Sequence, residues 1–258
     1  VRISRKTSSM LTDNNYTNSS SSETYKISTK YDDDGSDLNY QNRQKNQKRN
    51  FAALPGTDGA KAAAADAVNN NNNNDNDNEE EEDQDVLIAG ALRVPGDLYD
   101  KLFNYQQHCV GWMWNLHVQH VGGILGDEMG LGKTIQVIAF LAGLHHSNLF
   151  NSPTLILCPA TVMVQWLQEI HKWYPPFRVW LLHPTSKTLN FNLSDEEMID
   201  KAFEVGNIVI TTYSTFRSRR RIFLNRPWGY VICDEGHKIR NPDADITMIM
   251  RRRRTKTY

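Results

Sequence analysis

Two stretches of the chain have residue types and spacings that suit the binding of phosphate groups. The first is the glycine-rich string Gly126-Asp127-Glu128-Met129-Gly130-Leu131-Gly132-Lys133-Thr134, and the second is Asp234-Glu235-Gly236-His237 at the end of a later apolar run. A loop that cradles phosphates must point its backbone N–H groups at the anion, and glycines permit that backbone where side chains would obstruct it. The two stretches together predict a site for the phosphates of a nucleotide.

Two polar side chains of each stretch have a distinct role in this interpretation. Lys133 supplies a point charge for the β- and γ-phosphates, Thr134 offers a hydroxyl to Mg²⁺, and a helix that begins there presents its positive end. Asp234 would hold the hydrated Mg²⁺, and Glu235 would orient and deprotonate the attacking water. We therefore predict ATP hydrolysis with ATP and Mg²⁺ as cofactors and with Lys133, Asp234 and Glu235 as the catalytic residues.

Gln106, upstream of the loop, is a candidate for contact with the base. Its amide offers a donor and an acceptor together, which suits an adenine edge, whereas a solvated glutamine on an amphipathic helix is the alternative. The loop itself departs from the common pattern, because Asp127 stands where a glycine is usual. His237 is one of the predicted nucleotide-binding residues. The others are Gln106, Asp127, Glu128, Met129, Gly130, Leu131, Gly132, Lys133 and Thr134.

The expected elements alternate between short apolar runs and helical patterns. Buried strands are expected over residues 122–125, 154–158, 179–182, 208–212 and 230–233. Crossover helices are expected over residues 133–146, 163–173 and 195–203, the last of which opens with Ser194 and Glu197 at capping-box spacing. This alternation predicts an α/β fold with a parallel sheet and flanking helices. Every candidate residue then lies at the carboxyl edge of the sheet, where such folds bind ligands.

Charge and composition divide the chain into two parts. Residues 1–97 contain 11 Lys and Arg against 17 Asp and Glu, whereas residues 98–258 contain 18 against 13. The first part is rich in Ser and Asn, with an asparagine run at 69–74 and an acidic block at 79–83, and its few apolar residues cannot bury a core. We predict a disordered arm over 1–97 and one globular domain, an ATP-binding lobe, over 98–258.

Two local features of the arm could have a structural or functional role, or could simply belong to a solvated linker. The alanine-rich piece 60–68 could be transiently helical. A basic cluster could serve as a nuclear-import address, but for both features a solvated linker is the favoured interpretation. The cluster consists of Arg43, Lys45, Lys48 and Arg49.

The cysteines and tryptophans read as core residues. Cys109, Cys158 and Cys233 sit in apolar surroundings without the spacing of metal ligands, so neither ligation nor a disulfide is expected. Apolar neighbours favour core packing of the six tryptophans over base stacking. Because no run approaches the roughly eighteen apolar residues of a membrane span, no membrane partner is expected.

Two turns are candidates for contact with a nucleic-acid backbone. Pro159-Ala160-Thr161 and Thr211-Thr212-Tyr213-Ser214 follow expected strands and offer hydroxyls and N–H groups to phosphate oxygens without reading bases. Turn chemistry and helix capping are the alternative for both. A cluster of arginines suits a duplex backbone, although a solvated, charge-rich loop is the commoner explanation of such a cluster. These are Arg217, Arg219, Arg220 and Arg221.

The loop Asp-Glu-x-Gly-x-Gly-Lys-Thr resembles that of superfamily 2 helicase-like ATPases, and in particular the Swi/Snf-type branch of chromatin-remodelling ATPases. Further strings are similar to the Cockayne syndrome group B branch of that family, including its fungal counterpart in transcription-coupled repair. The similarity spans residues 94–254, with Asn115 in place of a more usual acidic residue. The strings are Val94-Pro95-Gly96-Asp97, Leu102-Phe103-Asn104-Tyr105-Gln106, Trp112-Met113-Trp114-Asn115-Leu116-His117 and His237-Lys238-Ile239-Arg240-Asn241-Pro242-Asp243-Ala244-Asp245.

The resemblance implies a RecA-like first motor lobe of a nuclear, ATP-driven translocase on double-stranded DNA. The implied partners are nucleosomes or, in transcription-coupled repair, stalled RNA polymerase II, and strand separation is not implied. It assigns adenine recognition to Gln106. To His237 it assigns the coupling of nucleotide state to the second lobe, for which a satisfied buried histidine is the alternative. It assigns contact with the tracking DNA strand to Pro159, Ala160, Thr161, Thr212 and Tyr213.

The ends of the chain lead to a further expectation. The chain begins without Met, and it stops before the Gly-Thr-Pro-like strand and the second lobe with which the family continues. We therefore expect a fragment that binds nucleotide but hydrolyses it very poorly, since arginine fingers contribute about 10³ to 10⁵ in rate. The alternative is a non-catalytic nucleotide-binding or interaction module whose arm recruits partners. A kinase or a transport ATPase would need an acceptor site or a different signature, which the sequence lacks.

Overall fold

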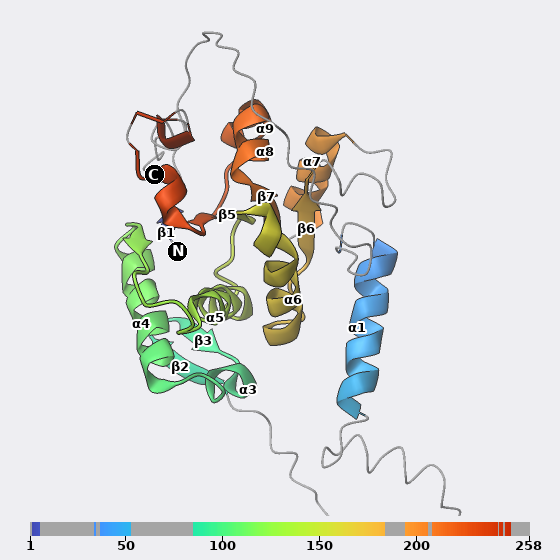
Figure 1. Ribbon diagram of the computed structural model, residues 1–258. Coiled ribbons are helices and arrows are strands. Elements are labelled where there is room, and N and C mark those ends of the chain that lie inside the picture. Colours follow the sequence, from blue (N-terminus) through green and yellow to red (C-terminus); the bar gives the residue numbers. More distant parts are fainter. Residues whose placement is uncertain are drawn as a thin grey trace, which may run out of the picture.

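The structure is a computed structural model that describes residues 2–5, 34, 37–52, 85–183, 194–205, 208–241, 243–244 and 246–248 (Figure 1). Several sequence features lie outside these ranges: the alanine-rich piece 60–68, the asparagine run 69–74, the acidic block 79–83 and the arginines at 251–254. Within the described ranges, no helix is long and apolar enough to cross a membrane.

A six-stranded sheet forms the centre of the molecule, in the order β4-β1-β8-β5-β7-β6. Strands β5, β6, β7 and β8 run parallel to one another, as predicted. Strand β1 pairs antiparallel with both β4 and β8, which the sequence did not indicate. The strand bounds are β1 Arg2–Arg5, β4 Gly123–Ile124, β5 Thr154–Cys158, β6 Val179–Leu182, β7 Ile208–Thr212 and β8 Tyr230–Cys233.

Helices lie on both sides of this sheet, and the three predicted crossover helices are among them (Figure 1). Ser194 and Glu197 form the predicted capping box at the start of α7, with 2.7 Å from Ser194 N to Glu197 Oε2. The helices are α1 Asp37–Ala52, α3 Gly96–Tyr99, α4 Asn104–Val118, α5 Lys133–His146, α6 Met163–Trp173, α7 Asp195–Val205, α8 Tyr213–Ser218 and α9 Arg220–Leu224, with 3-10 turns η1 Ala160–Val162 and η3 Gly236–Ile239.

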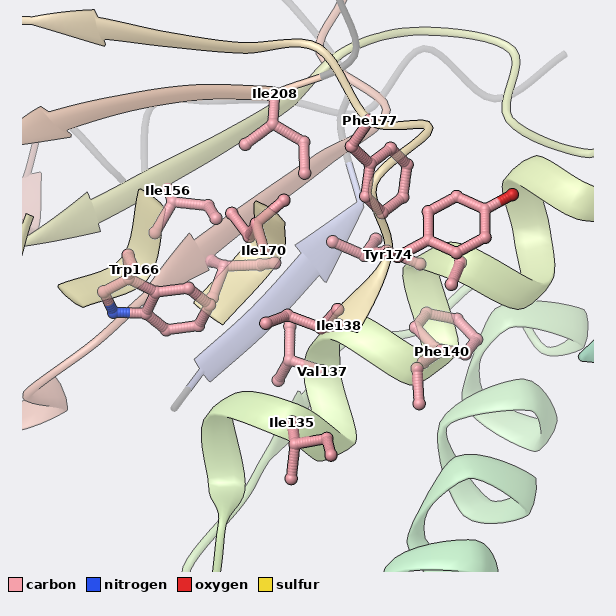
Figure 2. Close-up of a cluster of buried hydrophobic side chains, with 14 of the residues drawn as sticks. Ile135, Val137, Ile138, Phe140, Ile156, Trp166, Ile170, Tyr174, Phe177 and Ile208 are labelled. Atoms are coloured by element: carbon pink, nitrogen blue, oxygen red, sulfur yellow. The ribbon is translucent and has the colours of Figure 1, made fainter. Parts of the chain in front are cut away.

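Alternate residues of each central strand face opposite sides of the sheet and build two separate cores. On β5, Ile156 joins the core beneath α4, α5 and α6, whereas Leu155 and Leu157 join the core beneath α7, α8 and α9. Figure 2 shows part of the first core, in which Ile156 and Ile170 lie beside Trp166. Because both faces are covered, strands β5, β6, β7 and β8 are mostly apolar, which is why they could be predicted from the sequence.

The core prediction for cysteines and tryptophans is largely confirmed. Cys158 and Cys233 are buried, Cys109 is half-buried, and none of the three forms a disulfide within the described ranges. Four tryptophans are almost fully buried, while Trp112 is 38% exposed. Burial raises the pKa of the Cys109 thiol to about 12, so it stays protonated. The four buried tryptophans are Trp114, Trp166, Trp180 and Trp228.

Ordered elements precede Leu98, where the sequence predicted the domain to begin. The hairpin of β2 (Val86–Ala89) and β3 (Leu92–Val94) comes first, and Leu92 and Val94 are fully buried in the core with α5. Gly143 of α5 permits this approach, because a Cβ there would lie 2.9 Å from a methyl group of Val94. The packed body thus includes residues from about the start of β2.

Helix α1 lies within the stretch predicted as a disordered arm, and it is attached beside β6 (Figure 1). Asp34, 1% exposed, accepts hydrogen bonds from Arg43 of α1 and from the backbone N of Val179, and it pairs with His171 of α6 at 2.8 Å. Burial would raise the pKa of Asp34, but the bonds from His171 and Arg43 outweigh it and hold the pKa below its usual value. Arg43, a member of the basic cluster, is thus part of an internal contact.

Candidate active site

The glycine-rich loop connects β4 to α5 and has the backbone that a phosphate cradle requires. Gly130 has a φ of +88° and Gly132 a φ of +71°, both in the left-handed region that favours glycine. Gly132 is the residue from which α5 begins, so the positive end of that fourteen-residue helix opens into the loop. Gly126, the first glycine of the string, has no such constraint. The loop is therefore shaped by two of its three glycines.

Lys133 occupies the concave side of the loop. Its Nζ donates to the backbone carbonyls of Asp127 at 2.7 Å and Glu128 at 2.9 Å. These bonds place the ammonium group inside the turn formed by the loop residues, and Thr134 follows it on the first turn of α5. The predicted phosphate contacts of Lys133 and Thr134 require this arrangement of the two side chains at the helix start.

Gln106, the predicted adenine contact, is 5% exposed and lies against the loop. Its Oε1 accepts from the backbone N of Phe103 at 3.0 Å, and its Nε2 donates to the carbonyl of Leu131 at 3.3 Å. Gln106 therefore caps α4 and steadies the phosphate loop. An amide has two donor hydrogens and two acceptor lone pairs, so one of each is left for a base.

Gln136 is a loop-supporting residue that the sequence did not indicate. It lies on α5, has no exposed surface, and donates through Nε2 to the Leu131 carbonyl at 3.1 Å and to Asp127 Oδ2 at 3.2 Å. Gln136 thus bridges the two limbs of the loop from below. A polar residue three positions after the loop lysine, within the otherwise apolar run 135–144 of the helix, was the available signal.

The acidic pair follows β8, and its backbone is constrained. Glu235 has φ 51° and ψ 55°, a left-handed conformation that is uncommon for a residue other than glycine. Strained backbone of this kind concentrates at functional sites. His237 Nδ1 lies 3.2 Å from Glu235 Oε2, with 60% and 48% of the two side chains exposed. The carboxylate of Glu235 is therefore held at the surface beside an imidazole.

The register of β1 sets the distance between the loop and the acidic pair. Arg2 pairs with Ile124 at the end of β4 and with Cys233 at the end of β8. Both strands run antiparallel to β1, so they run parallel to each other and end level, two strand spacings or about 10 Å apart. The loop after Ile124 and the acidic pair after Cys233 therefore start at the same edge of the sheet, with β1 between their two strands.

The donor set of this edge fits Mg²⁺. Thr134 and Asp234 supply a hydroxyl and a carboxylate, which are hard oxygen ligands, and Asp234 is half-buried at the strand end. Within the described ranges, no cluster of three or more His, Cys, Asp or Glu could bind a metal by itself. Mg²⁺ commonly takes only one or two protein ligands and completes its shell with phosphate and water.

The DNA-contact candidates fall into two groups. Thr161 is exposed on η1, beside half-buried Pro159 and Ala160. Thr212 is 4% exposed, and its Oγ1 caps α8 by accepting from Thr215 N at 3.1 Å. The Tyr213 hydroxyl donates to the carbonyl of Asp234 at 2.5 Å. The hydroxyls of Thr212 and Tyr213 thus bond inside the protein, which is the capping alternative for Thr212, while Thr161 faces solvent.

Of the four clustered arginines, Arg219 pairs with Asp195 at the start of α7. Arg217, Arg220 and Arg221 are exposed on α8 and α9. Three of the four guanidinium groups therefore lie on the surface, on the two short helices that follow β7.

Alanine substitutions at the three loop glycines should separate backbone strain from crowding. Gly130→Ala is expected to cost about 1 kcal/mol in free energy of unfolding, because its φ is positive although no atom lies within 4 Å of a new Cβ. Gly132→Ala should cost more, about 2 kcal/mol, since that Cβ would also lie 2.5 Å from Gln106 Nε2. Gly126→Ala is the control, expected within about 0.5 kcal/mol of the parent. Urea unfolding followed by tryptophan fluorescence measures all three, and equal effects would contradict the loop geometry.

A largely parallel sheet that bears a glycine-rich lysine loop and an Asp-Glu pair at one edge is typical of phosphate-loop nucleotide hydrolases, the class to which Swi/Snf-type ATPases belong. Residues 105–257 match the family described as SNF2-related domain. The chain belongs to this family.

Relatives by sequence include the DNA excision repair protein ERCC-6 of Homo sapiens, 49% identical over 173 residues, which cover 63% of this chain and 11% of the relative. The DNA repair and recombination protein RAD26 of Saccharomyces cerevisiae is 40% identical over 211 residues, covering 66% of this chain and 19% of the relative. These matches confirm the resemblance to the Cockayne syndrome group B and fungal repair branch. The chain spans less than a fifth of the length of either relative.

A solved structure matches as well. The Sulfolobus solfataricus SWI2/SNF2 ATPase core in complex with dsDNA aligns with a TM-score of 0.51 and 26% identity, covering 65% of this chain and 32% of that structure. The predicted α/β class with a parallel sheet and flanking helices is confirmed.

Proposed function

We propose that this chain is the first lobe of a DNA-dependent ATPase that translocates on double-stranded DNA and hydrolyses Mg²⁺·ATP to do so. The observation that carries the proposal is the level ending of β4 and β8, which brings the lysine loop and the acidic pair to one edge. Lys133 and the N–H groups of the loop would bind the β- and γ-phosphates, and Thr134 and Asp234 would hold Mg²⁺. The ion would neutralise the charge of the transferred phosphoryl group.

Glu235 acts in this proposal as the residue that orients and deprotonates water. Its carboxylate projects from a left-handed turn at the surface, next to His237. His237 limits the positions open to that carboxylate, which fits the coupling role that the family resemblance assigns to it. We further propose that Gln106 contacts the adenine with its remaining donor and acceptor.

The working partners belong to the same proposal. The relatives named above are DNA repair proteins, and the matched structure is a complex with dsDNA. We propose that the chain acts in the nucleus on duplex DNA, with nucleosomes or with RNA polymerase II in transcription-coupled repair. Thr161 and the backbone of the turns after β5 and β7 would contact phosphates. Because arginine fingers would come from a second lobe, hydrolysis by residues 1–258 alone should be slower by about 10³ to 10⁵.

Binding to DNA of two kinds tests this proposal. A duplex should bind more tightly than a single strand of the same sequence, and it should raise the rate of ATP hydrolysis more. Affinity should fall as salt rises, with a slope of log K against log salt of about −0.9 for each phosphate contact. Fluorescence anisotropy at several salt concentrations gives the slope. Equal binding and equal stimulation by single strands would reject translocation on duplex DNA.

A further inference from the structure

Every polar group of Asp234 is engaged. Its backbone N continues the sheet by donating to the Leu157 carbonyl at 2.8 Å, and its backbone carbonyl accepts from the Tyr213 hydroxyl at 2.5 Å. Of the carboxylate oxygens, Oδ1 accepts from the backbone N of Glu235 at 2.9 Å. Oδ2 accepts from Nε1 of Trp166 at 2.8 Å. One main-chain donor and one indole therefore fix the rotation of the carboxylate.

Trp166 is well placed to impose that rotation. It lies on α6, is 2% exposed, and packs with Ile156 and Ile170 in the core beneath α5 and α6 (Figure 2). Packing holds the indole in one position, so its N–H cannot move with the carboxylate. The hydrogen bond therefore forms only when the Asp234 carboxylate has the orientation seen here. A carboxylate oxygen has two lone pairs, and a single N–H occupies one of them. Both Asp234 oxygens thus keep a lone pair for a cation.

We propose that Trp166 is a positioning residue for the metal site: its indole N–H holds the Asp234 carboxylate in the orientation that binds Mg²⁺. This inference rests on the proposed function, in which Asp234 is the magnesium ligand. Partners that hold a metal-ligating side chain in place typically contribute about tenfold or more to metal affinity. Trp166 lies on α6, the helix that follows the Pro159-Ala160-Thr161 turn, so this candidate DNA-contact turn is linked through α6 to the carboxylate of Asp234.

The chain offers a matched control on the same helix. Trp173 Nε1 donates to Glu169 Oε2 at 2.7 Å, an indole-to-carboxylate bond of nearly the same length that does not involve the acidic pair. Trp166→Phe and Trp173→Phe each remove one such bond and one fused ring. A comparison of the two separates the metal site from the general cost of losing an indole.

The experiment measures the affinity of the 258-residue chain for a fluorescent ADP analogue, first in EDTA and then during a Mg²⁺ titration. For Trp166→Phe we expect unchanged affinity in EDTA and about a tenfold higher Mg²⁺ concentration at the midpoint. Trp173→Phe should match the parent in both. If Trp166→Phe gives the parental Mg²⁺ midpoint, the inference is wrong. If the parent itself shows no Mg²⁺-dependent tightening, the proposed function fails instead.

A second variant covers the case in which Trp166→Phe does not fold. Site-specific incorporation of β-(3-benzothienyl)alanine at position 166 keeps the size and shape of the indole and replaces its N–H by sulfur. The same tenfold shift of the Mg²⁺ midpoint is expected, because only the donor is lost. A parental midpoint in this variant would assign Trp166 to packing alone.

Discussion

Lys133→Ala should weaken the binding of ATP about 10- to 100-fold. The reason is the loss of the ammonium group that sits inside the loop, bonded to the carbonyls of Asp127 and Glu128. A hydrogen bond to a charged group contributes about 1.5 to 3 kcal/mol, which corresponds to that range of affinity. Titration with a fluorescent ATP analogue in the presence of Mg²⁺ gives the dissociation constants.

Lys101→Ala is the control for this substitution. Lys101 is 61% exposed and pairs with Asp97 at 3.9 Å on the surface, so its removal should leave the affinity for ATP unchanged. Nucleotide binding by Lys133→Ala at the parental level would contradict the phosphate-loop assignment. Weak hydrolysis that Lys133→Ala leaves unchanged, with partner binding intact, would favour the alternative of a non-catalytic interaction module.

In a protein that also contains the second lobe, Glu235→Gln should keep ATP binding and slow the chemical step by about 10² to 10⁴, the usual contribution of a general base. An amide has nearly the shape of the carboxylate but cannot take a proton from water. Single-turnover hydrolysis of radiolabelled ATP with duplex DNA measures the step, and the fluorescent analogue measures binding. Glu204→Gln, at an exposed position of α7, is the control and should behave as the parent.

Glu235→Gly gives an independent check of the backbone at this position. Since Glu235 adopts a left-handed conformation, glycine should raise the free energy of unfolding by about 1 kcal/mol while it abolishes turnover. A variant that is more stable but inactive would mean that Glu235 keeps its strained backbone because turnover needs its carboxylate. Normal turnover in Glu235→Gln would show that another group activates the water.

The sheet and its crossover helices could be predicted because their signals are local. The apolar runs that became β5, β6, β7 and β8 end where loop residues begin, and Ser194 and Glu197 specify the start of α7 through contacts within one helical turn. The role of the loop glycines could also be predicted from the sequence, since a left-handed backbone restricts the residue type. Predictions of this kind depend on spacing and on few distant residues.

The contacts that could not be predicted join residues far apart in the sequence. Asp34 and His171 meet across more than a hundred residues, and nothing in either neighbourhood indicates the other. Trp166 was correctly predicted to pack in the core, but the partner of its N–H depends on how α6 lies over the end of β8. The hydroxyls of Thr212 and Tyr213 point inward for the same reason, because tertiary packing decides which face of a turn meets solvent.

The position of Gln106 would make recognition of the base and recognition of the phosphates interdependent in the proposed site. Its amide bonds the Leu131 carbonyl of the phosphate loop, and the same amide is the proposed contact for adenine. Any shift of the amide toward a base would change its hydrogen bond to the Leu131 carbonyl, and any movement of the loop would displace the amide. By thermodynamic reciprocity, the factor by which bound phosphate alters affinity for the base must equal the factor by which the base alters affinity for phosphate.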